Sequence, residues 1–232
     1  MKDVIVVTSG KGGVGKSTIS AMIGLNLSSR GRILLIDADL GLNNLDLLLN
    51  VPSSSYDIAD VIKGRCELEE AMMKVKENLF ILNLCLSSEI RKYPEYLLET
   101  IIGQTGDYFD YIIIDSPAGM EQGFLNTLSV ATRGIIVLND ELTSYEDGRK
   151  IQRLCKIHNL KNILYVMNRY NKKESIKEYI RTRFRYYLND NHLIYINNVA
   201  GNLYRKYRLL SHDKEFNNLI KEIVKPNSVR VF

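Results

Sequence analysis

The sequence predicts an α/β fold with a single doubly wound, mostly parallel sheet and helices on both faces. Short apolar runs rich in β-branched residues recur along the chain without polar alternation, which is typical of strands buried on both faces. Segments with helical spacing of apolar residues separate these runs. The 232 residues are 45% hydrophobic and 25% charged, a composition that provides a full core and excludes disorder. Because no linker-like stretch interrupts the pattern, we expect residues 1–232 to form one domain.

Each expected strand is an apolar run that ends at a turn or a polar residue. The runs span residues 4–7, 33–36, 79–82, 111–114, 135–138, 163–167 and 193–196. The expected helices between them span residues 17–29, 121–132, 143–158 and 174–188, with another that begins after Pro94. A last amphipathic helix carries Phe216, Leu219, Ile220, Ile223 and Val224. We expect this helix to pack on the sheet, and residues 227–232 are too few for a separate membrane-binding helix.

A glycine-rich loop follows the first expected strand and matches the motif G-x-x-x-x-G-K-[ST], which predicts the P-loop NTPase type of this fold. Glycines allow backbone N–H groups to turn inward around an anion, and the helix that begins near Lys16 adds its positive dipole end. Lys16 can neutralise nucleotide phosphates, and the Ser17 hydroxyl can hold Mg²⁺. The residues expected to bind the phosphates of ATP are Gly10, Gly12, Gly13, Val14, Gly15, Lys16, Ser17 and Thr18.

Acidic residues end two of the other apolar runs. Asp37 and Asp115 are expected at the carboxyl edge of the sheet, where ligands of such folds bind. Both can organise Mg²⁺ together with Ser17. Asp39 can orient an attacking water, because phosphoryl transfer to water needs positioning more than covalent help. Gly119 leaves room for its backbone N–H to sense a γ-phosphate.

A second lysine, Lys11, lies inside the glycine-rich loop, and the segment 11–17 resembles the deviant Walker A motif of the MinD/ParA ATPases. Residues 36–46 and 114–123 are similar to further segments of that family, in the form found in MinD. The resemblance implies a homodimer that encloses ATP, with Lys16 acting on its own chain's nucleotide and Lys11 on the partner's. Lys11, Lys16 and Asp39 are then the catalytic residues, and a protein regulator or activator is expected.

The resemblance also implies that Asn168 and Arg169 contact or cover the adenine base. An asparagine amide can satisfy one donor and one acceptor of adenine. The chain departs from the family where an Asn-Pro-Glu segment is usual, because it reads Asn139-Asp140-Glu141 there. It also lacks the usual proline-containing loop after the last strand.

Charge is divided unevenly along the chain, although the net charge is only +4. Residues 1–148 hold 12 basic and 21 acidic residues, whereas residues 149–232 hold 19 basic and 6 acidic ones. This asymmetry favours an anionic partner, and we expect the basic region 149–208 to contact an anionic membrane surface or DNA. The alternative is that these charges only solvate helix faces.

The function that these features predict is a MinD-like, ATP-dependent dimerising switch that hydrolyses ATP and positions the cell-division site or a flagellar site. The alternative is a ParA-like, DNA-associated partition ATPase. Three scattered cysteines and the absence of a secretory apolar segment favour a cytoplasmic protein, with peripheral binding to the inner face of the cell membrane as a further option. No cysteine lies soon after Asp115, which excludes an electron-transfer relative with an iron–sulfur cluster.

Overall fold

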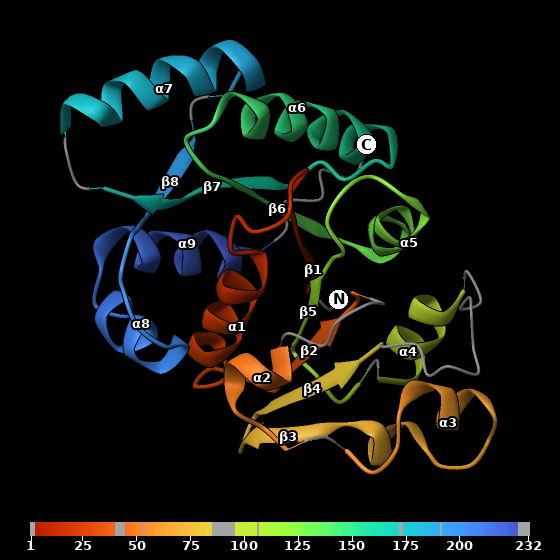
Figure 1. Cartoon of the computed structure of the whole chain (residues 1–232). Helices are drawn as coiled ribbons and strands as arrows, with labels where there is room; N and C mark the ends of the chain where they lie inside the picture. Colours follow the sequence, from red (N-terminus) through yellow and green to blue (C-terminus); the bar gives the residue numbers. More distant parts are fainter. Residues whose placement is uncertain are drawn as a thin grey trace.

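An eight-stranded sheet crosses the centre of the molecule in the order β3-β4-β2-β5-β1-β6-β7-β8 (Figure 1). The structure is a computed structural model and describes residues 3–39, 45–52, 54–84, 96–105, 107–171, 174–190 and 192–226. The strands are β1 (Asp3–Thr8), β2 (Ile33–Asp37), β3 (Met73–Lys76), β4 (Leu79–Asn83), β5 (Tyr111–Asp115), β6 (Arg133–Leu138), β7 (Ile163–Tyr170) and β8 (Leu193–Asn197). Every pairing is parallel except that of β3 with β4. The predicted doubly wound sheet is confirmed.

Helices cover both faces of the sheet (Figure 1). They are α1 (Lys16–Leu27), α2 (Leu45–Leu49), α3 (Ile58–Ile62), a 3-10 turn (Leu68–Ala71), α4 (Leu97–Thr105), α5 (Gln122–Val130), α6 (Leu142–Ile157), α7 (Glu174–Leu188), α8 (Leu203–Leu210) and α9 (Lys214–Val224). Successive side chains of β1 point to opposite faces, so Ile5 and Val7 pack with α1, α8 and α9. Val6 instead packs with α5, α6 and α7, and Val4 packs with α4.

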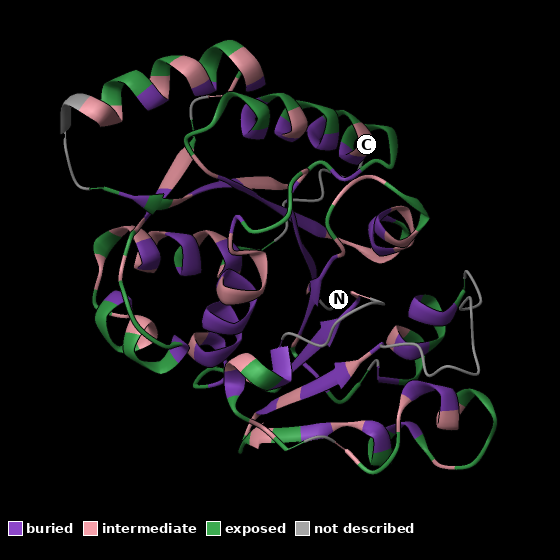
Figure 2. Ribbon diagram, viewed as in Figure 1, coloured by how far each residue is buried: buried purple, intermediate pink, exposed green. Residues whose placement is uncertain are grey.

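All seven predicted strands are present, and Figure 2 shows that the central ones are buried along their length. The sequence reading missed β3, α2, α3 and α8. β3 lies at the edge of the sheet and alternates Met73 and Val75 with exposed Lys74 and Lys76, so it contains no continuous apolar run. α2 and α3 have five residues each, too few to show a helical period, and α8 was read only as a cluster of basic residues interleaved with tyrosines.

The final helix, α9, packs on the sheet as its apolar spacing predicts. Phe216, Leu219, Ile220 and Ile223 are all at most 1% exposed and belong to the same apolar cluster as α1. Its apolar face is therefore used within the fold and is not available to a membrane. Among the helices that the structure describes, none is both long and apolar enough to cross a bilayer.

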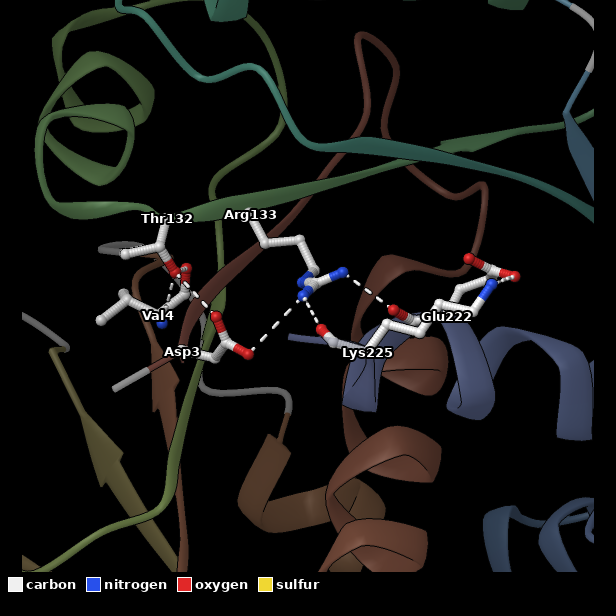
Figure 3. Close-up of polar contacts among 6 residues, drawn as sticks. All are labelled: Asp3, Val4, Thr132, Arg133, Glu222 and Lys225. Atoms are coloured by element: carbon white, nitrogen blue, oxygen red, sulfur yellow. Dashed lines mark hydrogen bonds and ion pairs between the residues drawn. The ribbon is translucent and has the colours of Figure 1, made fainter. Parts of the chain in front are cut away.

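A buried arginine fixes the end of α9 at the amino edge of the sheet (Figure 3). The guanidinium of Arg133 donates to the carbonyl oxygens of Glu222 at 2.8 Å and Lys225 at 2.9 Å. It also lies 3.6 Å from the carboxylate of Asp3 at the start of β1. Because the last carbonyls of a helix have no partner within the helix, this side chain satisfies groups that burial would otherwise leave unpaired.

Candidate functional site

The glycine-rich loop joins β1 to α1 at the carboxyl edge of the sheet. Gly13 and Gly15 have φ angles of +78° and +98°, a left-handed conformation that strains any residue with a side chain. A Cβ on Gly10 would lie 2.2 Å from the Cβ of Asp147, so glycine lets the loop rest directly on α6. By contrast, a Cβ on Gly12 or Gly13 would meet no atom within 4 Å, which leaves the outer side of the loop open.

The first turn of α1 is built to receive an anion. Its N-cap residue, Gly15, provides no side-chain cap, and no acidic residue lies in the first turn. The amides of Lys16, Ser17 and Thr18 therefore begin a 12-residue helix with its dipole uncompensated by a carboxylate. Phosphate oxygens fit this position, and the Lys16 ammonium begins the same turn.

Asp115 ends β5 beside this helix and is only 2% exposed. Burial raises the pKa of its carboxyl group to about 7 against the opposing effect of Ser17, whose hydroxyl hydrogen-bonds to it; the charge of Asp37 raises the pKa further. The Ser20 hydroxyl donates to Oδ1 of Asp115 at 3.0 Å. A bound divalent cation would stabilise the charged carboxylate that burial disfavours, so the site fits Mg²⁺.

Asp37 lies next to Asp115 in the sheet register and is fully buried. Its two carboxylate oxygens accept the backbone N–H groups of Asp39 at 3.1 Å and Leu45 at 3.2 Å. Asp37 therefore shapes the segment that follows β2 in addition to facing the predicted metal position. Asp39 is partly exposed at the same edge, whereas residues 40–44 of the family-like segment lie outside the described residues.

Few protein ligands gather at this edge. Within the described parts of the chain, no group of three or more His, Cys, Asp or Glu side chains could by itself hold a metal ion. Mg²⁺ is commonly held by one or two carboxylates together with substrate phosphates. The donor set of Ser17, Asp37 and Asp115 fits that mode of binding and not a metal cage made only of protein.

Lys11 lies against its own chain. Its ammonium forms an ion pair and hydrogen bond with Oε2 of Glu141, which directly precedes α6. Oε1 of Glu141 accepts the Asn139 side-chain amide at 2.7 Å. The Lys11 contact is the main reason why the pKa of Glu141 lies below its usual value, and the nearby charge of Arg169 adds to it.

The predicted base-binding residues end β7 close to the phosphate loop. Nδ2 of Asn168 donates to the carbonyl oxygen of Val14 at 2.8 Å, and a Cβ on Gly15 would lie 2.3 Å from the same nitrogen. Asn168 therefore supports the loop. Arg169 is exposed and has a φ angle of +57°, unusual for a residue with a side chain.

Gly119 lies in the loop after β5, where its φ angle of +94° requires glycine or strain. Its N–H donates to the carbonyl oxygen of Ser9 at 3.4 Å, and a Cβ would meet no atom within 4 Å. The structure thus brings Gly119 beside the start of the phosphate loop. Sequence reasoning missed Ser20 and Glu141 as members of the site. For Ser20 a signal existed, because it follows Ser17 by three positions and lies on the same side of α1.

The basic region 149–208 does not form one face. Arg149, Arg153 and Lys156 are exposed at helical spacing along α6. α8, which carries Arg205 and Arg208, packs in the apolar cluster on the opposite face of the sheet. A surface that binds one anionic partner can therefore use the α6 stripe or the α8 cluster, but the sheet separates the two.

Comparisons with known proteins agree with this geometry. A sequence profile described as an AAA domain matches residues 2–166. The septum site-determining protein MinD of Bacillus subtilis (strain 168) is 38% identical over 156 residues, which are 65% of this chain and 58% of that protein. A solved structure of a MinC:MinD cell division protein complex from Aquifex aeolicus shares 31% identity and a TM-score of 0.76, with 95% of this chain and 93% of that chain covered. The chain belongs to the MinD/ParA family.

The chain is also similar to the solved structure of MinD of Pyrococcus horikoshii complexed with Mg-ADP, with a TM-score of 0.80 and 26% identity. The match covers 97% of this chain and 97% of that chain. That relative supports nucleotide and Mg²⁺ binding within the family. The chain spans 54 to 65% of the length of the curated MinD relatives that it matches. The activities of these full-length relatives therefore enter only as proposals about this chain.

Proposed function

We propose that the chain is a MinD-like ATPase that acts as a dimerising switch in placing the division site. ATP would bind at the carboxyl edge of the sheet, close a homodimer and be hydrolysed to ADP and phosphate. The observation that carries the proposal is the uncapped N-terminus of α1 beside the buried carboxyl of Asp115, with two lysines in one loop. Family membership gives this arrangement its functional context.

The chain's own residues divide the chemistry between them. The amides at the start of α1 and the Lys16 ammonium hold and neutralise the phosphates. Ser17, Asp37 and Asp115 are the residues that would hold Mg²⁺, which supplies further charge neutralisation when bound. Asp39 orients the attacking water, and Lys11 reaches the nucleotide of the partner protomer. Closure of the dimer excludes bulk water from the phosphates, which strengthens each of these interactions.

The Asp39→Ala variant tests this proposal. We expect it to bind Mg-ATP, to hydrolyse it at least 100-fold more slowly because the water is no longer oriented, and to accumulate as a dimer. Size exclusion with light scattering measures the dimer, and phosphate release measures turnover. Lys16→Ala is the matched control: it should lose nucleotide binding and remain a monomer. A variant Asp39→Ala that binds ATP and stays monomeric would contradict the dimer.

Partners are part of the same proposal. A protein regulator fits the switch, and the solved MinC:MinD complex of a relative supports this type of partner. We place the protein in the cytoplasm, with an anionic membrane as its working surface and DNA as the alternative. Adding anionic liposomes or duplex DNA to the ATPase assay separates these surfaces, because stimulation by one of them identifies it. Reversing Arg149 and Arg153 to Glu should abolish the stimulation if the α6 stripe makes the contact.

A further inference from the structure

Asn83, the last residue of β4, has a buried side-chain oxygen that the fold leaves unpaired. The residue as a whole is partly exposed, yet its Oδ1 is shielded from solvent and has no hydrogen-bond partner among the residues that the structure describes. An acceptor that loses water on folding and gains no donor lowers the stability of the fold. Such groups are uncommon in folded proteins, so this position indicates a partner that arrives after folding.

The sheet register places Asn83 next to the predicted Mg²⁺ ligands. Asn83 pairs with Asp37 of β2, and Asp37 pairs with Asp115 of β5 (Figure 1). The backbone ladder continues past these positions. The Leu84 N–H donates to the Asp37 carbonyl oxygen at 2.9 Å. The Ala38 N–H donates to the Asp115 carbonyl oxygen at 3.0 Å. The ends of the three strands are therefore held together, and neighbouring strands lie about 4.8 Å apart.

The three side chains also point to the same side of the sheet. Successive residues of a strand face opposite sides, so the residue two positions earlier shows where each side chain points. Those earlier residues all pack in the apolar cluster that contains the buried residues of α1, and they are Ile81, Leu35 and Ile113. Asn83, Asp37 and Asp115 therefore form one row on the side of α1, whose first turn carries Ser17.

The chemistry of the unpaired oxygen selects its partner. An amide oxygen only accepts hydrogen bonds, and a carboxylate such as that of Asp37 is also an acceptor. A phosphate oxygen, which is a further acceptor, does not fit this end of the row. Mg²⁺ usually keeps several waters when carboxylates and phosphates hold it, and these waters donate hydrogen bonds to the groups around them. A water ligand of Mg²⁺ is therefore the donor that suits Asn83.

The order of the row favours contact through a water over direct binding of the ion. Asp37 lies between Asn83 and Asp115, so the outer two residues are two strand spacings apart. Direct ligands of Mg²⁺ lie about 2.1 Å from the ion, whereas a hydrogen bond from a water ligand reaches further. Asn83 thus lies at the outer end of the predicted Mg²⁺ site.

We propose that Asn83 is a positioning residue whose amide oxygen accepts a hydrogen bond from a water ligand of Mg²⁺ and thereby strengthens Mg²⁺ binding beside Asp37. The inference rests on the proposed nucleotide switch and assigns it a residue outside the phosphate loop. Asn83 makes no contact with the nucleotide in this arrangement. It raises the affinity for Mg²⁺ and leaves nucleotide binding without the metal unchanged. One hydrogen bond sets the expected effect at about fivefold in Mg²⁺ affinity.

Asn83→Leu tests the proposal because it removes the acceptor and keeps a side chain of similar size. Calorimetry measures ADP binding at a series of Mg²⁺ concentrations and in EDTA. We expect the Mg²⁺ concentration that gives half of the tightening of ADP binding to rise about fivefold, with the ADP affinity in EDTA unchanged. An unchanged Mg²⁺ requirement overturns the proposal. An equal loss of ADP affinity with and without Mg²⁺ also overturns it, because that pattern indicates a general distortion of the site.

Asn83→Asp separates the amide oxygen from the amide nitrogen. An ionised carboxylate accepts the same hydrogen bond and donates none. This variant should therefore need no more Mg²⁺ than the unmodified chain. If its Mg²⁺ requirement is as high as that of Asn83→Leu, the site uses the amide N–H group and the proposal is wrong.

Asn78→Leu is the matched control, with the same substitution at the opposite end of the strand. Asn78 directly precedes β4, and its amide donates to the Ser28 carbonyl oxygen at 3.3 Å. The control should lower the urea midpoint of unfolding and leave the Mg²⁺ requirement unchanged. Asn83→Leu should raise the midpoint of the ligand-free protein, because it removes an unpaired buried oxygen. A lower midpoint for Asn83→Leu, or a fivefold higher Mg²⁺ requirement for Asn78→Leu, contradicts the proposal.

The unmodified chain separates this proposal from the proposed function. If Mg²⁺ does not tighten ADP binding to the unmodified chain, the nucleotide switch is wrong and the role of Asn83 is refuted with it. If Mg²⁺ tightens ADP binding equally in the unmodified chain and in Asn83→Leu, the switch stands and only the role of Asn83 is refuted.

Discussion

The two edges of the sheet differ in how far their buried polar groups are paired. At the amino edge, the terminal nitrogens of the buried Arg133 guanidinium meet two helix-end carbonyls and the carboxylate of Asp3, while its Nε has no hydrogen-bond partner among the described residues. At the carboxyl edge, the buried carboxyl of Asp115 has a raised pKa, and the side-chain oxygens of Thr8 and Asn83 are buried without a hydrogen-bond partner. Unsatisfied polar groups of this kind lower stability. The difference indicates that one edge stabilises the fold and the other reserves its polar groups for a ligand.

This contrast makes predictions of opposite sign. Substitutions that neutralise the carboxyl edge should stabilise the ligand-free protein and impair nucleotide binding. Substitutions at the amino edge should destabilise the protein and leave nucleotide binding unchanged in the folded fraction. Enzyme sites commonly combine function with local destabilisation. The sign of the change in the free energy of unfolding therefore tests whether the carboxyl edge is a functional site.

Asp115 gives the largest expected effect. Its pKa is about 7 in the folded chain and near 3.8 in the unfolded chain, so the folded state binds more protons between these pH values. Stability therefore falls as the pH rises from 4 to 7, by as much as about 4 kcal/mol for a shift of this size. In Asp115→Asn this contribution is absent. Without Mg²⁺, urea unfolding should show that the free energy of unfolding of Asp115→Asn increases relative to that of the unmodified chain as the pH rises across this range.

If the free energies of unfolding of the two proteins change in parallel with pH, ionisation of Asp115 does not destabilise the fold. The carboxyl edge would then lose its main distinguishing feature. Saturating Mg²⁺ and ADP provide the control, because a ligand that binds the charged carboxylate should stabilise the unmodified chain and not Asp115→Asn.

Arg133 gives the next largest effect, with the opposite sign. Arg133→Met keeps most of the apolar stem but leaves the Glu222 and Lys225 carbonyls and Asp3 without their shared donor. We expect a loss of about 3 kcal/mol in the free energy of unfolding, at the lower end for a broken buried ion pair because Asp3 is partly exposed. Urea unfolding measures this loss. The ADP affinity of the folded variant should be unchanged, and a weaker affinity would contradict the separation of the two edges.

Sequence patterns predicted the strands and the phosphate loop because each is a local feature. A buried parallel strand is a continuous apolar run, and the loop is a contiguous motif. The contacts that hold Lys11 and Val14 join residues 130 and 154 positions apart. They depend on β6 lying beside β1 and β7 beside β6, a strand order that the sequence leaves open. The division of the basic residues of 149–208 between two faces of the sheet is hidden in the sequence for the same reason, because the connection to α8 crosses to the other face.

Asn168 gives the smallest expected effect and sharpens the comparison within the carboxyl edge. Its amide supports the phosphate loop through the Val14 carbonyl, whereas the family resemblance assigns it to the adenine base. Asn168→Ala should weaken binding of ADP and of inorganic tripolyphosphate alike, about fivefold for one hydrogen bond, as titration calorimetry can measure. Asn171→Ala, an exposed neighbour beyond β7, is the control and should change neither affinity. A loss confined to ADP would assign the side chain to the base and leave the loop supported by Gly15 and α6 alone. Weaker binding of both ligands would show that the polar network of this edge reaches from β1 to β7. The phosphate loop and the strand ends would then respond to nucleotide as one unit.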